Sequence, residues 1–214
     1  MSFFKGGGFV MYASAPYKFE FRRVFRSLIK RAKPYGTVLD CACANGKFVN
    51  FFGDADYVGV DILPSRIDEA KDRYVDRDRA SFYSGSLCDS PWLLAGRKFD
   101  LVVSTHTLAH IDGDNKLVAV RNLINSVERG GCMVLQLACS DYSVVLPLLR
   151  EEMDVLAEVR YKGVFSRLFE KARARGVVSV NGRLSYLFWR SFAKIFSYFD
   201  VGKREETLFL LCRR

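Results

Sequence analysis

The apolar residues of this chain follow two periods, which alternate along its first two thirds. Short runs rich in β-branched and aromatic residues predict strands, and stretches with apolar residues three or four positions apart predict helices. The expected strands cover residues 37–41, 57–61, 80–83, 99–104 and 132–138, and the expected helices cover 17–33, a short segment from about 47, a segment from 64, and 115–127. Strands that alternate with helices predict an α/β fold, in which helices cover both faces of a parallel sheet.

The remaining third departs from this alternation. Residues 141–175 have a helical pattern with a basic face, and Asn181-Gly182 is typical of a hairpin turn. Apolar runs near 196–201 and 207–212 are joined by so few residues that they can pair only as an antiparallel hairpin. We therefore predict four parts: an N-terminal extension with a basic amphipathic helix (1–36), a ligand-binding core (37–140), an inserted substrate or lid region (141–196) and a C-terminal strand pair that completes the sheet (197–214).

The segment between the first two expected strands contains the most informative pattern. The first strand has Asp40 near its end, and the turn that follows is built from small residues, namely Ala42, Cys43, Ala44 and Gly46. Such a turn, followed by a helix, lets backbone N–H groups and the positive end of the helix dipole face an anionic ligand. Asp61 closes the second strand about twenty residues later, where nucleotide-binding βαβ units bind ribose hydroxyls. The pattern predicts an adenosine-containing cofactor.

The net charge of +9 is concentrated in the two ends of the chain. Residues 1–36 carry eight Lys and Arg against one acid, and residues 141–214 carry fourteen against nine, whereas the middle has eleven against fourteen. Basic flanks favour an anionic substrate, a nucleic acid or a membrane surface, and they serve equally as a solvated surface. We find no run of the roughly twenty apolar residues needed to cross a bilayer, no signal-peptide pattern and no CxxC pair, so we expect a cytoplasmic protein with reduced thiols.

From about residue 37 to residue 138 the sequence resembles the class I S-adenosylmethionine-dependent methyltransferases. The family's first-strand motif, an acid and a glycine-rich turn, corresponds to residues 40–46. Its fourth-strand motif corresponds to 99–104, and its Gly-Gly turn before the fifth strand corresponds to 128–135. The resemblance implies a Rossmann-like, doubly wound α/β sheet of the seven-stranded methyltransferase type, mostly parallel with one antiparallel C-terminal strand.

The same resemblance implies S-adenosylmethionine as the cofactor and S-adenosylhomocysteine as its product. Asp40 and the turn residues 42–46 would bind the methionine part, Asp61 the ribose, and Ile62 with Ser86 and Leu87 the adenine. Ser104 and Thr105, at the end of the fourth strand, complete the expected cofactor site. Two of the family's turn glycines are alanines here, and Ser86 replaces the usual acid beside the adenine. These departures predict that the cofactor binds more weakly than is typical of the family, or that the protein belongs to the family and has lost its activity.

Two histidines, the only ones in the chain, follow the fourth expected strand. His106 and His110 therefore lie at the carboxyl edge of the sheet, where such folds bind ligands. Either imidazole could accept a proton from a substrate hydroxyl, because its unperturbed pKa is near neutrality. Either could instead brace the next helix. The two are four residues apart, a spacing that binds zinc on a helix, but no third ligand is evident and we expect no metal.

These residues predict a methyltransferase that acts on a small or medium-sized acceptor, at oxygen, with anionic and saccharide compounds as the first candidates. An RNA methyltransferase that uses the basic flanks is a less favoured alternative, and it would bind RNA with a steep salt dependence. A non-catalytic protein that binds the cofactor is the other alternative. A Rossmann dehydrogenase would require G-x-G-x-x-G, and Phe48 occupies the place of its last glycine.

Overall fold

The computed structural model describes residues 16–89, 92–161, 164–175, 183–199 and 207–214. Its contacts divide the chain into two units. One unit contains Met1–Arg23 and Tyr161–Glu206, and the other contains Val24–Arg160 and Thr207–Arg214. The first helix, α1 (Pro16–Arg31), belongs to both units, because the division falls within it. We describe each unit by itself.

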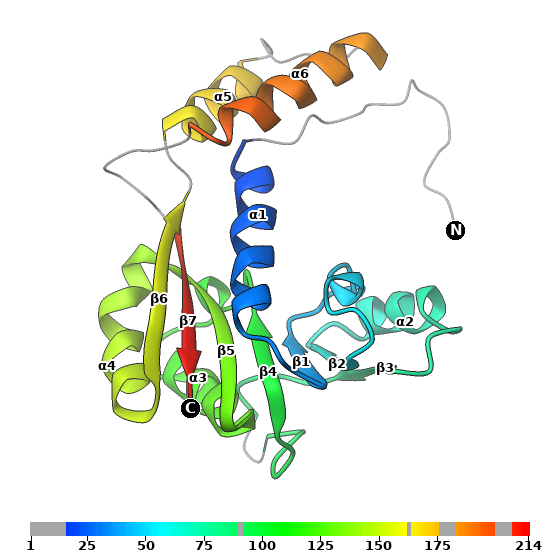
Figure 1. The fold of residues 1–214 in the computed structure, drawn as a ribbon, viewed down its shortest axis with the longest axis vertical. Helices are drawn as coiled ribbons and strands as arrows, with labels where there is room; N and C mark the ends of the chain where they lie inside the picture. The colour runs from blue at the N-terminus through cyan, green and yellow to red at the C-terminus, as the bar shows by residue number, and fades with distance from the viewer. Residues whose placement is uncertain (1–15, 90–91, 162–163, 176–182, 200–206) are drawn as a thin grey trace. The chain divides into compact units, whose positions relative to one another are not determined.

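The larger unit is built on a seven-stranded sheet with the order β3-β2-β1-β4-β5-β7-β6 (Figure 1). Strands β1 to β5 pair in parallel, and β7 runs antiparallel to β5. This topology confirms the predicted α/β class and its single reversed strand beside β5. The strands are β1 (Thr37–Cys41), β2 (Asp56–Asp61), β3 (Ala80–Ser84), β4 (Phe99–Ser104), β5 (Val127–Ala138), β6 (Asp154–Tyr161) and β7 (Thr207–Arg213).

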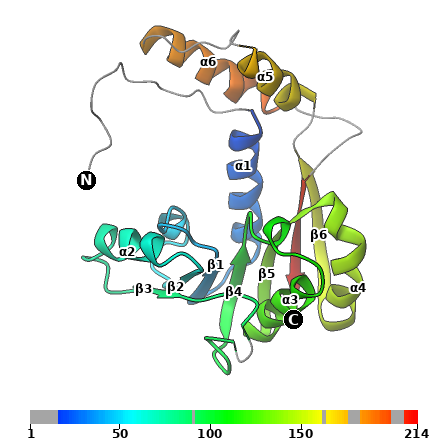
Figure 2. The same cartoon turned by 180° about the vertical axis from the view of Figure 1, so that it is seen from behind.

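Helices cover the sheet because its strands are apolar on both faces. On one face, α3 (Asn115–Ser126) and α4 (Tyr142–Glu152) lie beside each other, as the view from behind shows (Figure 2). Their buried side chains join those of β1, β2, β4, β5 and β7 in one hydrophobic core. Alternate residues of β7 face the other side, where Phe209 stacks against Phe25 of α1 with ring centroids 6.0 Å apart. Helix α2 (Pro64–Arg73) connects β2 to β3.

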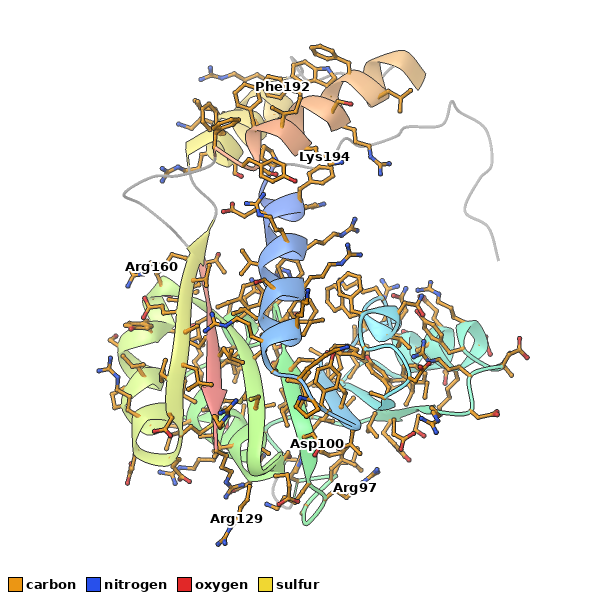
Figure 3. The ribbon with its side chains drawn as sticks, in the orientation of Figure 1. Arg97, Asp100, Arg129, Arg160, Phe192 and Lys194 are labelled. Carbon is orange, nitrogen blue, oxygen red and sulfur yellow. The ribbon has the colours of Figure 1, made fainter. Side chains whose placement is uncertain are left out.

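Asp100 fixes the start of β1 against β4 (labelled in Figure 3). Its Oδ2 accepts hydrogen bonds from the backbone N–H groups of Gly36 and Thr37, both at 2.8 Å, and from the Thr37 hydroxyl at 3.0 Å. Burial raises the pKa of this carboxyl, but the three donors outweigh it, so the pKa lies below its usual value. These three hydrogen bonds hold the start of β1 in its register with β4, and Asp40 lies further along β1.

The smaller unit contains two helices, α5 (Val164–Ala174) and α6 (Arg183–Phe196), which lie side by side (Figures 1 and 2). Phe169 and Ala193 are buried between them, and Trp189 packs edge-on against Phe169 with centroids 6.1 Å apart. Arg23 donates a hydrogen bond to the carbonyl of Ser197 at 3.0 Å. In the described residues, no helix is long and apolar enough to cross a membrane.

The C-terminal third differs most from the prediction. Residues 154–161, predicted as helix, form β6, and the burial of this segment alternates along 154–160 with the period of a strand. The predicted strand at 196–201 is wrong as far as it is described, because Phe196 ends α6 and residues 197–199 form a turn. β7 therefore pairs with β5 and β6, not with a hairpin partner next to it in sequence. The Asn-Gly pair at 181–182 lies outside the described residues.

Two smaller differences concern the core. The short helix expected from about residue 47 is a single 3₁₀ turn, Val49–Phe51. Phe48 and Phe51 pack against Phe25 of α1, so these aromatic side chains contribute to the hydrophobic packing of the unit. The Gly-Gly pair lies inside β5, which begins at Val127, and not in a turn before it.

Candidate functional site

A cavity of about 470 Å³ opens at the carboxyl ends of β1, β2 and β4. This volume is within the range of small-molecule sites. Five of the predicted cofactor residues line it, namely Ala42, Asp61, Ile62, Ser86 and Leu87, and so do both predicted catalytic residues, His106 and His110. The structure thus brings together residues from four separate segments of the chain at the edge of the sheet that the sequence predicted.

Asp61 lies at the centre of this arrangement, at the end of β2. Its side chain is nearly buried and faces the cavity. Oδ2 accepts a hydrogen bond from the N–H of Ala44 at 2.8 Å, and Oδ1 accepts one from the N–H of Leu63 at 3.0 Å. Because each carboxylate oxygen has two lone pairs, both can still accept a hydroxyl. Asp61 therefore holds the first turn in place and remains a suitable acceptor for ribose hydroxyls.

The turn after β1 uses its own N–H groups. The N–H groups of Ala42 and Cys43 both donate to the Val60 carbonyl, at 2.7 and 3.1 Å, and that of Gly46 donates to the Cys43 carbonyl at 3.0 Å. With the Ala44 N–H bound to Asp61, these four donors are satisfied within the protein. These four N–H groups are therefore used within the protein, and contact between the other N–H groups of the turn and an anionic ligand stays a prediction.

Both alanines that replace family glycines have left-handed backbone conformations. Their φ angles are +65° for Ala42 and +49° for Ala44, a region that costs an L-residue roughly 1–2 kcal/mol. The backbone of the turn therefore has the conformation that favours glycine, although alanine stands at both positions. Ala42 lines the cavity, whereas Ala44 does not.

Gly46, the family glycine that is kept, has a packing role. Its φ is +72°, and a Cβ there would lie 2.8 Å from Cε2 of Tyr74. The Tyr74 hydroxyl donates to the Gly46 carbonyl at 2.8 Å. Cys43 also lies beneath the turn, where burial raises the pKa of its thiol. Neither residue lines the cavity.

Asp40 is fully buried below the turn and does not line the cavity. Its Oδ2 accepts a 2.6 Å hydrogen bond from the Tyr57 hydroxyl, and its Oδ1 has no partner among the described residues. Burial raises the pKa of Asp40 to about 6, although the Tyr57 hydrogen bond and the charge of Lys47 lower it. An unpartnered buried acceptor is costly and suggests a missing donor. The ammonium of the methionine part of S-adenosylmethionine is a donor of this kind.

Part of the cavity lining is apolar. Ile62 is 65% exposed beside Asp61, and Leu87 and Val60 provide further apolar surface. Ser86 follows β3 in a loop that is fixed locally, because its N–H donates to Asp89 Oδ2 at 3.1 Å and its hydroxyl accepts the Cys88 N–H at 3.1 Å. An apolar wall with a few polar groups at its edge suits an adenine ring.

The two histidines lie on the wall formed by the segment after β4. His106 has a φ of +59°, and His110 ends a short 3₁₀ helix, Leu108–His110. Because no helix contains both, they do not form the helical zinc pair that their spacing allowed. The described residues contain no group of three or more His, Cys, Asp or Glu side chains that could hold a metal.

Ser104 and Thr105, predicted to touch the cofactor, are buried at the end of β4 and do not line the cavity. Three residues that the sequence analysis did not single out are close to the site. Asp112 and Asn115 line the cavity, and Gln136 of β5 contacts His106. Gln136 could have been noticed as the single polar residue in the apolar run 132–138.

Comparisons with known proteins agree with this geometry. A family model described as "Methyltransferase domain" matches residues 38–131. The N-methyltransferase NodS from Bradyrhizobium japonicum WM9, in complex with S-adenosylhomocysteine, is similar in structure, with a TM-score of 0.65 and 16% identity over 94% of this chain and 89% of that one. A TehB-like S-adenosylmethionine-dependent methyltransferase from Corynebacterium glutamicum ATCC 13032 Kitasato has a TM-score of 0.59 and 17% identity over 92% and 95% of the two chains. A search of curated proteins found no match.

Residues 38–131, a little less than half of the chain, match the methyltransferase model, and the structure is similar to those of S-adenosylmethionine-dependent methyltransferases. The sheet order and the cavity at the carboxyl edge of the sheet therefore belong to a fold of the methyltransferase type. S-adenosylmethionine carries a methyl group already activated on a sulfonium, so a protein that uses it has chiefly to bind and align the acceptor.

Proposed function

We propose that this protein is an S-adenosylmethionine-dependent methyltransferase that transfers a methyl group to an oxygen atom of a small or medium-sized acceptor. The observation that carries the proposal is the position of two imidazoles, His106 and His110, on the wall of the cavity that also contains Asp61. A hydroxyl is a weak nucleophile, and a base beside it raises the rate by about 10²–10⁴. The basic flanks of the sequence favour anionic acceptors, including sugar derivatives.

We assign the cofactor contacts along the cavity as follows. Asp61 accepts the ribose hydroxyls, while Ile62, Ser86 and Leu87 surround the adenine. Below the turn and outside the cavity lining, the buried Oδ1 of Asp40 is the acceptor that we assign to the ammonium of the methionine part. The turn residues Ala42, Cys43, Ala44 and Gly46 set the shape of the floor, and Ser104 and Thr105 support the neighbouring β4 end.

We also propose a cytoplasmic location. All six cysteines are free in the structure, and burial of Cys41, Cys43, Cys132 and Cys212 is typical of reduced thiols that act as small apolar residues.

Calorimetric titration with S-adenosylmethionine and S-adenosylhomocysteine, on protein stripped of carried-over ligand, is the first test. We expect micromolar binding of both. A screen of anionic and sugar hydroxyl compounds should then give S-adenosylhomocysteine release, with the methyl group located on oxygen by NMR of the product. Methylation of amines alone would contradict the oxygen assignment. RNA binding that weakens steeply with salt, together with methylated RNA, would favour the nucleic-acid alternative.

A further inference from the structure

Gln136 is a polar side chain in the middle of β5, between two fully buried leucines. Leu135 and Leu137 are 0% and 1% exposed, and Gln136 itself is 7% exposed. A buried amide is costly unless its donor and acceptor groups are hydrogen-bonded. Both ends of the Gln136 amide lie close to His106, on the neighbouring strand end.

The backbone of His106 depends on this contact. Its φ of +59° is uncommon for a residue with a side chain, and such conformations persist only where surrounding contacts hold them. The N–H of His106 donates to Gln136 Oε1 at 3.0 Å. Gln136 therefore holds the bend through which the chain turns from β4 toward the cavity.

The same hydrogen bond decides which end of the amide faces the imidazole. A backbone N–H can only donate, so the atom that receives it must be the amide oxygen. The amide nitrogen then lies on the other side, 3.5 Å from Nδ1 of His106. An amide nitrogen can only donate, so this contact is a hydrogen bond only when Nδ1 offers its lone pair, which places the proton of the neutral imidazole on Nε2.

We infer that Gln136 is a positioning residue that keeps His106 in the Nε2–H tautomer, so that His106 donates a hydrogen bond to the acceptor and does not take its proton. This role toward the acceptor rests on the proposed function, whereas the tautomer does not. His110 is then the base that receives the hydroxyl proton. The acceptor carries, beside the hydroxyl to be methylated, a group that accepts a hydrogen bond, such as a carbonyl or a carboxylate.

The tautomer can be measured directly because the chain has only two histidines. Protein labelled with ¹⁵N-histidine gives two imidazole patterns in long-range ¹H–¹⁵N spectra, and His110→Gln assigns them. Above the titration range we expect His106 to show an unprotonated Nδ1 and a protonated Nε2. A protonated Nδ1, or averaged shifts of the two nitrogens, overturns the inference without any variant of Gln136.

Gln136→Glu provides the complementary test. One carboxylate oxygen can still accept the His106 N–H, and the other can now accept a proton from Nδ1. The His106 proton should therefore move to Nδ1 in this variant. Gln136→Met, which keeps the length of the side chain without the amide, should give averaged shifts. An unchanged tautomer in folded Gln136→Glu contradicts the inference, and circular dichroism and cofactor titration establish the fold.

Kinetics separates donation from proton transfer. A glutamine at position 106 can donate an N–H but cannot take a proton. His106→Gln should therefore raise the acceptor KM less than His106→Ala does, and His106→Ala should raise it about tenfold. His110→Gln should lower kcat by about 10²–10⁴. Equal losses of kcat in His106→Gln and His106→Ala would make His106 the base. Absence of cofactor binding in the wild type would instead refute the proposed function and leave the NMR result standing.

Discussion

Oδ2 of Asp61 accepts a hydrogen bond from the backbone N–H of Ala44 at 2.8 Å. The acid expected to bind the ribose is thus also the residue that ties the end of β2 to the turn after β1. Cofactor affinity and the stability of the fold are linked through this one carboxylate.

Asp61→Ala should therefore reduce both quantities. We expect cofactor affinity to fall by roughly 1–3 kcal/mol, and the free energy of unfolding of the cofactor-free protein to fall by about 1–3 kcal/mol, because two backbone N–H groups lose their acceptor. Calorimetry and urea denaturation measure the two effects. Asp56→Ala, at the exposed start of the same strand, is the matched control and should change neither by more than about 0.5 kcal/mol. An unchanged free energy of unfolding in Asp61→Ala would show that the turn after β1 does not depend on the Asp61 carboxylate.

Replacement of the turn alanines by glycine should stabilise the protein. Ala42→Gly and Ala44→Gly each remove the strain of a positive φ, roughly 1–2 kcal/mol, and each add unfolded-chain entropy of about 0.5–1 kcal/mol. The expected net gain in the free energy of unfolding is about 0.5–1 kcal/mol for each. Ala119→Gly, in α3, is the control and should destabilise by about 1 kcal/mol or more. A lower free energy of unfolding in both turn variants would contradict the presence of backbone strain at Ala42 and Ala44.

Asp40→Asn should make the cofactor-free protein more stable at neutral pH and weaken cofactor binding. The pKa of Asp40 is raised from 3.8 to about 6, so the folded state binds this proton more tightly than the unfolded state does. Asp40 therefore opposes folding above about pH 6, and its unfavourable contribution decreases as the pH falls from about 6 to about 4.

The difference in free energy of unfolding between Asp40→Asn and wild type should be roughly 1–3 kcal/mol at pH 7.5 and smaller at pH 5, as measured by urea denaturation. The wild type should also bind the cofactor less well at pH 5 than at pH 7.5, because a protonated Asp40 no longer pairs with an ammonium. An Asp40→Asn variant that is less stable at pH 7.5 would mean that the ionised carboxylate has a partner.

The Lys116–Asp141 pair connects the start of α3 to the 3₁₀ turn Cys139–Asp141, which directly precedes α4. Lys116 Nζ lies 2.6 Å from Asp141 Oδ1, and the two side chains are 14% and 12% exposed. Lys116→Met leaves a buried carboxylate unpaired and should lower the free energy of unfolding by about 3–5 kcal/mol. Lys116→Met with Asp141→Asn should recover part of this loss. Arg121→Met is the control in the same helix, since its pair with Glu152 is 4.0 Å long and exposed, and should cost at most about 1 kcal/mol.

The first five strands could be predicted from the sequence, because each contains a short run of β-branched, aromatic or other apolar residues bounded by turn residues. Asp40, Asp61, Ile62 and Leu87 could be placed by the family motif, which depends on short-range order along the chain. The prediction failed at β6, where apolar and polar residues alternate within a longer charged segment that also suits a helix. It also failed at Phe196, whose strand assignment assumed that neighbours in sequence pair.

The sequence by itself determined the class of the fold and the edge of the sheet at which the cavity lies, since strand periodicity and turn composition are local properties. Only the tertiary structure decided how the site groups are used. The N–H groups of the first turn bind Val60 and Asp61, Gly46 makes room for Tyr74, and Gln136 orients His106. Each of these contacts joins residues 17 or more positions apart in the chain. Hydrogen bonding and close packing between them depend on where the sheet brings the strands, and no local pattern records that.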